Sequence, residues 1–312
     1  MTGSLCPASL RPALPRAGLA VLATLAALAA TPAEAACTLR IERAEAAAWN
    51  AGGGYNVFDR NGIAERFELE VRRVDADPEP CDAVVTLAPA GRSDLAQAGS
   101  RLAFALRPAS QRAILDGDSV TLLGEDLLPQ DLLRLDYEVI LLPGQIVAAG
   151  RYRGALLAEV RRKDGGLQEL EDSEKIPATA RVRSNARIGF AGTSGRRQTV
   201  DFGELTEGKT PGITPQILVQ STSDFSLEIT SENRGALAQR ADGGDWRIPY
   251  SASIGGQPLT LERGAQSVDF RGPTVETRRL PIEFRIESIE RQRAGVYRDT
   301  VTIVVTPEGA GF

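Results

Sequence analysis

Histidine is absent from this chain of 312 residues. Its absence removes the commonest general base, the commonest metal ligand and every Ser-His or Cys-His nucleophile pair. Cysteine occurs only three times, which leaves too few thiolates for a zinc site of the multi-cysteine kind. Carboxylates are plentiful, but the sequence does not place any two of them at the separation that a glycosidase needs. We therefore expect no catalytic residue, no metal site and no cofactor.

Lysine is also scarce, with 3 residues against 33 arginines. Acidic residues outnumber basic ones by 41 to 36, so the formal net charge at pH 7 is −5. A protein that binds nucleic acid needs a basic footprint. The sequence therefore predicts no nucleic-acid partner, and its acidity argues against binding to an anionic membrane surface.

Long apolar runs are lacking except for one near the start of the chain. Arg11 and Arg16 precede an apolar stretch at residues 17–30, and Ala33-Glu34-Ala35 has the small residues of a cleavage site. We interpret residues 1–35 as a cleaved secretory signal peptide; the alternative is an uncleaved anchor. No later run is long enough to span a bilayer, so we expect no transmembrane segment after cleavage.

Export changes the cysteine count. Cys6 leaves with the signal peptide, and Cys37 and Cys81 remain as an even pair in an oxidising compartment. We expect one disulfide between them within the first domain. The alternative is two free thiols.

The rest of the chain has the pattern of an all-β protein. Apolar and polar residues alternate in short runs at residues 67–71, 225–229, 282–286 and 301–305, which is typical of half-buried strands. The chain contains 31 glycines and 18 prolines, which mark turns between these runs. Short strands at such regular spacing predict β-sandwiches.

One segment occurs twice. Residues 149–157 place an Ala-Gly turn, a tyrosine and an arginine before an apolar strand, and residues 294–302 do the same. A repeat at this spacing indicates two tandem domains of one type rather than a solenoid. A charged stretch from 161 to 175 separates the two copies. We place an N-terminal β-sandwich at 36–176 and a C-terminal β-sandwich at 177–312.

Two segments are candidates for binding loops. Trp49, Tyr55 and Phe58 surround a glycine-rich loop, and aromatic side chains suit sugars or apolar surfaces. We expect these aromatics to anchor the loop in the core; a surface-binding loop is the alternative. Leucine pairs recur every five residues in segment 122–133, which fits neither the helix nor the strand period. We expect a loop or short helix that covers one end of the sandwich there; the alternative is an exposed binding loop that includes Leu127 and Leu128.

The C-terminal half resembles the spore coat protein U-like family, which consists of pilin-type domains of archaic chaperone–usher pili. The resemblance is carried by residues 200–208, 217–221, 225–229, 231–237, 248–250 and 294–305. The N-terminal half is more distant and keeps the two cysteines and the ending at 150–157. The resemblance implies two tandem immunoglobulin-like sandwiches, an adhesin-like one at 36–176 and a pilin-like one at 177–312 that lacks its last strand. It also implies a periplasmic chaperone, an outer-membrane usher and an adjacent pilus subunit as partners.

The resemblance implies a role for the last strand and for the start of the mature chain. Tyr297, Val301, Ile303 and Val305 are expected to form the acceptor edge for a donated strand, unless this edge lies inside a complete sandwich. Only Ala36 precedes Cys37 after the signal, so we expect a subunit that accepts a strand but gives none. The sequence thus predicts an exported tip adhesin that passes through the periplasm to the cell surface. The alternatives are a free-standing periplasmic or secreted binding protein and a carbohydrate-active enzyme.

Overall fold

The computed structural model describes residues 37–49, 53–164, 166–241 and 244–309. The expected signal peptide and Ala36 lie outside these residues. The described residues form β-strands and one three-residue 3-10 turn, Leu261–Arg263, but no α-helix, which confirms the prediction of an all-β fold. None of the described residues belongs to a helix that could cross a membrane.

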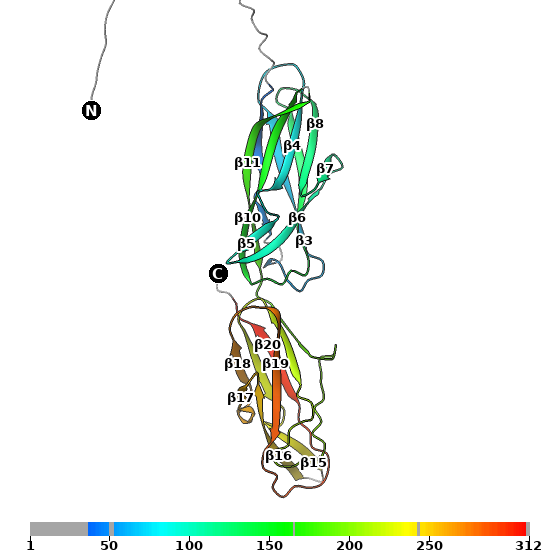
Figure 1. Cartoon of the computed structure of the whole chain (residues 1–312), viewed down its shortest axis with the longest axis vertical. Helices are drawn as coiled ribbons and strands as arrows, with labels where there is room; N and C mark the ends of the chain where they lie inside the picture. The colour runs from blue at the N-terminus through cyan, green and yellow to red at the C-terminus, as the bar shows by residue number, and fades with distance from the viewer. Residues whose placement is uncertain (1–36, 50–52, 165, 242–243, 310–312) are drawn as a thin grey trace, which may run out of the picture. The chain divides into compact units, whose positions relative to one another are not determined.

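The first eleven strands form one continuous sheet, which we call the first module (Figure 1). Its strand order is β1-β3-β9-β6-β5-β10-β4-β8-β7, with β11 paired to both β10 and β2. The strands are β1 (Leu39–Ala44), β2 (Ala47–Trp49), β3 (Ile63–Arg73), β4 (Cys81–Pro89), β5 (Asp94–Gln97), β6 (Ser100–Pro108), β7 (Ala113–Asp116), β8 (Ser119–Leu127), β9 (Leu132–Leu141), β10 (Gly150–Asp164) and β11 (Leu167–Val182).

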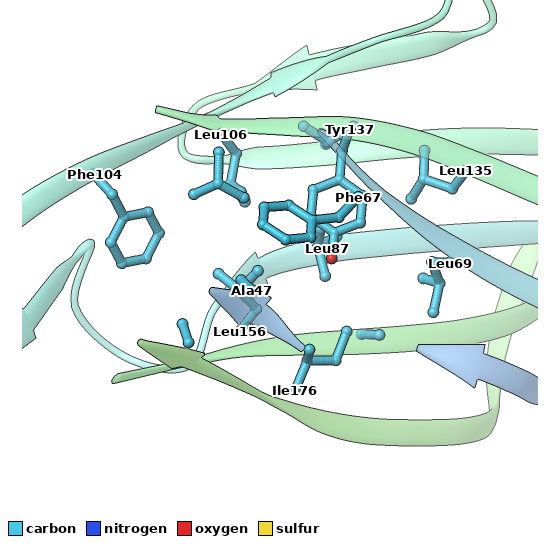
Figure 2. Close-up of a cluster of buried hydrophobic side chains, with 14 of the residues drawn as sticks. Ala47, Phe67, Leu69, Leu87, Phe104, Leu106, Leu135, Tyr137, Leu156 and Ile176 are labelled. Carbon is cyan, nitrogen blue, oxygen red and sulfur yellow. The ribbon is translucent and has the colours of Figure 1, made fainter. Parts of the chain in front are cut away.

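The core of the first module follows from the alternation of its strands. Phe67 of β3 packs against Tyr137 of β9, with ring centroids 5.7 Å apart, and the two strands pair directly at this position. Figure 2 shows Leu87 beside these rings and Leu156 and Ile176 contributed by the paired strands β10 and β11. All five side chains are buried, so the module has a hydrophobic core of its own.

The last nine strands, the second module, surround a separate hydrophobic core. One sheet has the order β12-β13-β19-β16-β15, with β17 paired to β16, and the other has the order β18-β14-β20. The strands are β12 (Ala186–Phe190), β13 (Gln216–Ser221), β14 (Phe225–Ser231), β15 (Ala236–Ala241), β16 (Gly244–Ile254), β17 (Gln257–Leu259), β18 (Gln266–Phe270), β19 (Thr274–Ile286) and β20 (Val301–Pro307). Strands β12 and β20 are therefore edge strands of different sheets.

Strand β11 passes through the position where the sequence places the domain boundary. Pro177 pairs with Ala155 of β10, and the ladder continues to Val182, which pairs with Gly150. The first sheet therefore extends beyond residue 176. The assignment of 36–176 and 177–312 to separate domains stays a prediction.

The expected disulfide is present between Cys37 and Cys81, whose Cα atoms are 6.1 Å apart. It joins the start of the first module to the first residue of β4. The nearby Arg73 is only 1% exposed and forms an ion pair of 2.7 Å with Asp75. The Arg73 guanidinium also donates to the main-chain carbonyl of Leu127. A covalent bond and a buried cation therefore hold the same end of the module.

The leucine-rich segment 122–133 is neither a loop nor a helix, so that prediction is wrong. Its first half belongs to β8 and its end to β9, with only residues 128–131 between the two strands. The ladder between β4 and β8 is irregular after Gly124, and Asp126 has a φ of 53°. Such a bulge inserts an extra residue and breaks the period of two. Leu127 is consequently buried, whereas Leu128 is 50% exposed.

Candidate strand-acceptor site

The repeated segment forms the same corner in both modules. Gly150 and Gly295 have φ values of 144° and 154°, and each lies against a glutamine side chain, Gln97 or Gln239. Both φ values lie in a region that side chains other than glycine rarely adopt. The repeat in the sequence therefore corresponds to a repeated structural corner.

The strands that follow the two corners differ in how well their inward side chains are covered. In β10, Leu156 and Val160 are 0% exposed. At the matching positions of β20, Val301 and Val305 pack against the core but are only partly buried, as is Ile303 between them. The inward side chains of β20 therefore keep part of their apolar surface open.

The number of neighbouring strands explains this difference. Strand β10 is paired to β11 along one edge and to β4 along the other. Strand β20 is paired along one edge to β14, where Ile229 faces Ile303 and Leu227 faces Val305. In the part of the chain that the structure describes, no strand is paired to the other edge of β20. Phe225, Leu227 and Ile229 of β14 are fully buried, so the exposure is confined to the edge.

A second edge strand adjoins β20. Cα atoms of β12 and β20 lie within 8 Å of one another, but the two strands belong to different sheets and form no ladder. Ile188 and Phe190 of β12 pack against the core and are partly buried. These two residues were not predicted as part of the site. Their spacing of two, in Ile188-Gly189-Phe190, is the local signal for a strand, but it does not place that strand beside β20.

The chemistry of the edge suits a polypeptide strand. The edge of β20 offers main-chain N–H and C=O groups, and its sequence Val301-Thr302-Ile303-Val304-Val305-Thr306 carries no charge. Proline enters β20 only at its last residue, Pro307, and an edge segment without charge, proline or bulge, such as 301–306, is a template for pairing with another strand. Pairing would add main-chain hydrogen bonds, and alternate side chains of the added strand would cover Val301, Ile303 and Val305.

Tyr297 lies in the corner that precedes β20, outside the strand itself. Its side chain packs against the core, and its hydroxyl donates to the main-chain carbonyl of Arg293 at 2.7 Å. The structure therefore brings Val301, Ile303 and Val305 together on one strand and places Tyr297 at its entrance.

Two of the three aromatics proposed for a binding loop are part of the core. Trp49 and Tyr55 are 0% exposed. The Trp49 indole donates to the carbonyl of Val139 at 3.0 Å, and the Tyr55 hydroxyl donates to that of Leu142 at 2.7 Å. This burial agrees with the expected role of Trp49 and Tyr55 as core anchors and corrects their inclusion among the candidate surface-binding residues.

The third aromatic residue of this loop also has less exposed surface for a ligand than a surface-binding loop would need. Phe58 is partly buried against the core, and residues 50–52 lie outside the described residues. Within the described part of the chain, no group of three or more acidic or cysteine side chains could hold a metal ion.

No protein-family model matches the sequence, and no curated protein is significantly similar to it. Several solved structures are similar at low identity. One is the complex of the chaperone CsuC with the tip adhesion subunit CsuE from archaic chaperone–usher Csu pili of Acinetobacter baumannii. The sequence identity is 14%, the alignment covers 86% of this chain and 99% of that chain, and the TM-score is 0.43.

Two further similar structures are adhesive subunits. CfaE, the adhesive subunit of the CFA/I fimbria of enterotoxigenic Escherichia coli, shares 12% identity over 81% of this chain and 76% of that chain, with a TM-score of 0.39. The CupB6 tip adhesin of Pseudomonas aeruginosa shares 12% identity over 89% and 97%, with a TM-score of 0.37.

Proposed function

We propose that this chain is an exported pilus subunit that is assembled by strand donation. The second module is the acceptor: a strand from a periplasmic chaperone, and later from an adjacent subunit, pairs with the open edge of β20. An outer-membrane usher would carry the assembled fibre to the cell surface. Membership in the spore coat protein U-like family stays a prediction that rests on the sequence motifs.

The observation that carries this proposal is the contrast between the two repeated corners. Leu156, which follows the first corner, lies in a strand with neighbours on both edges and is fully buried. Val301, at the matching position after the second corner, lies in a strand with one neighbour and is partly exposed. A donated strand would give β20 the second neighbour that β10 already has.

We place adhesion in the first module and the acceptor function in the second. Strand β11 fills the edge of β10 within the first module, so that strand needs no partner from another chain. This module can therefore present its surface to a receptor, as a tip adhesin does.

The proposal can be tested on the full mature chain with a synthetic peptide of alternating valine and threonine residues. A peptide that binds only the folded state raises the free energy of unfolding by about 2.7 kcal/mol at about 100 times its Kd. We expect the thermal unfolding of the second module to shift upward with peptide concentration. A control peptide with aspartate in place of valine should cause no shift, because it would bury charges against Val301, Ile303 and Val305.

A different outcome would favour the alternative of a free-standing binding protein. In that case the purified chain would be a monomer by native mass measurement, and its second module would unfold cooperatively at the same temperature with or without peptide. Co-purification with a periplasmic chaperone would argue against this alternative.

A further inference from the structure

One carboxylate at the entrance of β20 accepts four hydrogen bonds. Asp299 accepts from the hydroxyls of Ser231, at 2.6 Å, and Tyr250. It also accepts from the main-chain N–H groups of Asn233 and Thr300, at 2.9 and 2.8 Å. All lone-pair directions of the carboxylate are therefore used within the second module.

The donors to Asp299 belong to both sheets of the second module. Ser231 is the last residue of β14, and Asn233 follows it in the turn to β15, whereas Tyr250 belongs to β16 of the other sheet. The Asn233 side chain adds a bond to the main-chain carbonyl of Arg298 at 3.0 Å. Hydrogen bonds to a charged acceptor are stronger than neutral ones. We call this arrangement the Asp299 anchor; it fixes the residues just before β20 to both sheets.

The first module has no such anchor at the equivalent position. The repeat aligns Asp299 with Gly154, five residues after the Ala-Gly step. Gly154 has no side chain to bind, but it pairs with Ala178 of β11. The anchor therefore lies just before a strand that is paired along one edge in the described part of the chain, whereas Gly154 lies within a strand that is paired along both edges.

We propose that Asp299 is a positioning residue that holds β20 in strand geometry before a partner strand arrives. This inference rests on the proposed acceptor function. A strand paired along one edge only is prone to local opening, and an edge that opens presents no continuous row of main-chain groups. The Asp299 anchor restrains β20 at its start. A donated strand therefore pairs with an edge that is already ordered, and the binding free energy is not spent on ordering β20.

The donor from Tyr250 stays available over the physiological pH range. Burial raises the pKa of the Tyr250 hydroxyl, and its hydrogen bond to Asp299 raises it further. The hydroxyl thus remains protonated and can donate. Because Tyr250 is buried in β16, its replacement by phenylalanine removes one bond to Asp299 without changing β20.

The test compares Asp299→Asn with Asp269→Asn in the full mature chain. Asp269 is an exposed residue of β18 in the same three-stranded sheet and serves as the matched control. Amide hydrogen exchange is measured in β20 and in β19. We expect Asp299→Asn to speed exchange in β20 by about tenfold or more, with β19 unchanged, because the charge-assisted bonds that hold the residues just before β20 are weakened. Tyr250→Phe should act in the same direction, and the control variant should resemble the wild type.

Affinity for the alternating valine and threonine peptide provides the second measurement. We expect Asp299→Asn to bind it about tenfold more weakly, and bound peptide to restore slow exchange in β20. Unchanged exchange in β20, an equal rise in β19, or unchanged peptide affinity would each overturn the role of Asp299. Failure of the wild-type chain to bind the peptide would instead overturn the acceptor function. In that case, amide hydrogen exchange in β20, compared between wild type and Asp299→Asn without peptide, would still test the Asp299 anchor.

Discussion

Tyr152 and Tyr297 close equivalent turns with the same hydrogen bond. Each hydroxyl donates to the main-chain carbonyl four residues earlier, at 2.8 Å to Ala148 and 2.7 Å to Arg293. A tyrosine that bonds back to the backbone near the start of a strand is a recurrent feature of immunoglobulin-like sandwiches. Tyr152 is fully buried, whereas Tyr297 is partly exposed, so the pair differs in environment but not in geometry.

Removing the hydroxyl of Tyr152 should weaken the first module. Tyr152→Phe keeps the ring and deletes the bond to Ala148, which leaves a carbonyl acceptor without its partner. We expect the free energy of unfolding to fall by about 1 kcal/mol, measured by urea denaturation.

Tyr137 provides the matched control in the same core. Its hydroxyl is buried and has no hydrogen-bond partner in the part of the chain that is described, and burial raises its pKa. Tyr137→Phe removes an unsatisfied polar group, so stability should be unchanged or higher. Equal losses from both substitutions would contradict the assignment of these two hydroxyls.

Asp75 should make stability depend on pH in the acid range. Its hydrogen bond from Arg73 lowers the pKa of the carboxyl to about 2. The ionised form is favoured in the folded state, so its contribution is complete above about pH 4 and is lost as the pH falls towards 2. We expect the wild type to be more stable than Asp75→Asn by about 2 kcal/mol at pH 7. In urea denaturation this difference should shrink between pH 4 and pH 2; a difference that does not change with pH would refute the coupling.

Loss of the disulfide should affect the first module alone. Cys37 and Cys81 are 44 residues apart in sequence, and closing a loop of this length stabilises a fold by about 4 kcal/mol on the chain-entropy model. The double variant Cys37→Ser, Cys81→Ser should lower the first calorimetric transition and leave that of the second module unchanged. A shift of both transitions would show that the two cores do not unfold independently.

The two faces of β20 should respond differently to charge. Ile303 points into the core, whereas Val304 is 50% exposed on the other face. Ile303→Lys should abolish binding of the alternating peptide, because the added strand would have to bury a charge. Val304→Lys should keep peptide binding and reduce aggregation, since a charge on an edge strand discourages self-pairing. Equal peptide binding by both variants, measured by fluorescence titration, would argue against addition of a strand at this edge.

The sequence predicts strand β20 well, because the pattern of that strand is local. Val301, Ile303 and Val305 alternate with exposed residues in a way that only a strand explains. Cys37 and Cys81 are an isolated pair, so their partnership needs no knowledge of the fold.

Features that depend on irregular backbone or on distant segments were not predictable in this way. A bulge near Asp126 interrupts the period of two in segment 122–133. The sequence of this segment, which forms the end of β8 and the start of β9, therefore does not have the pattern of a strand. Ile188 and Phe190 join the site because β12 adjoins β20 in space, and no local pattern carries that information. Trp49 and Tyr55 are likewise held in the core by hydrogen bonds to the carbonyls of Val139 and Leu142, which lie far along the chain.

The lack of charge between Val301 and Thr306 has a kinetic consequence for a cell that makes this protein. Six consecutive β-branched, neutral residues on an open edge can associate with the same segment of another copy. The rate of such association between two copies increases with the square of the subunit concentration. The rate of binding to a chaperone increases only in proportion to the subunit concentration. If the proposed chaperone binds this edge, rapid synthesis without enough chaperone would favour precipitation, and the ratio of the two proteins would limit the yield.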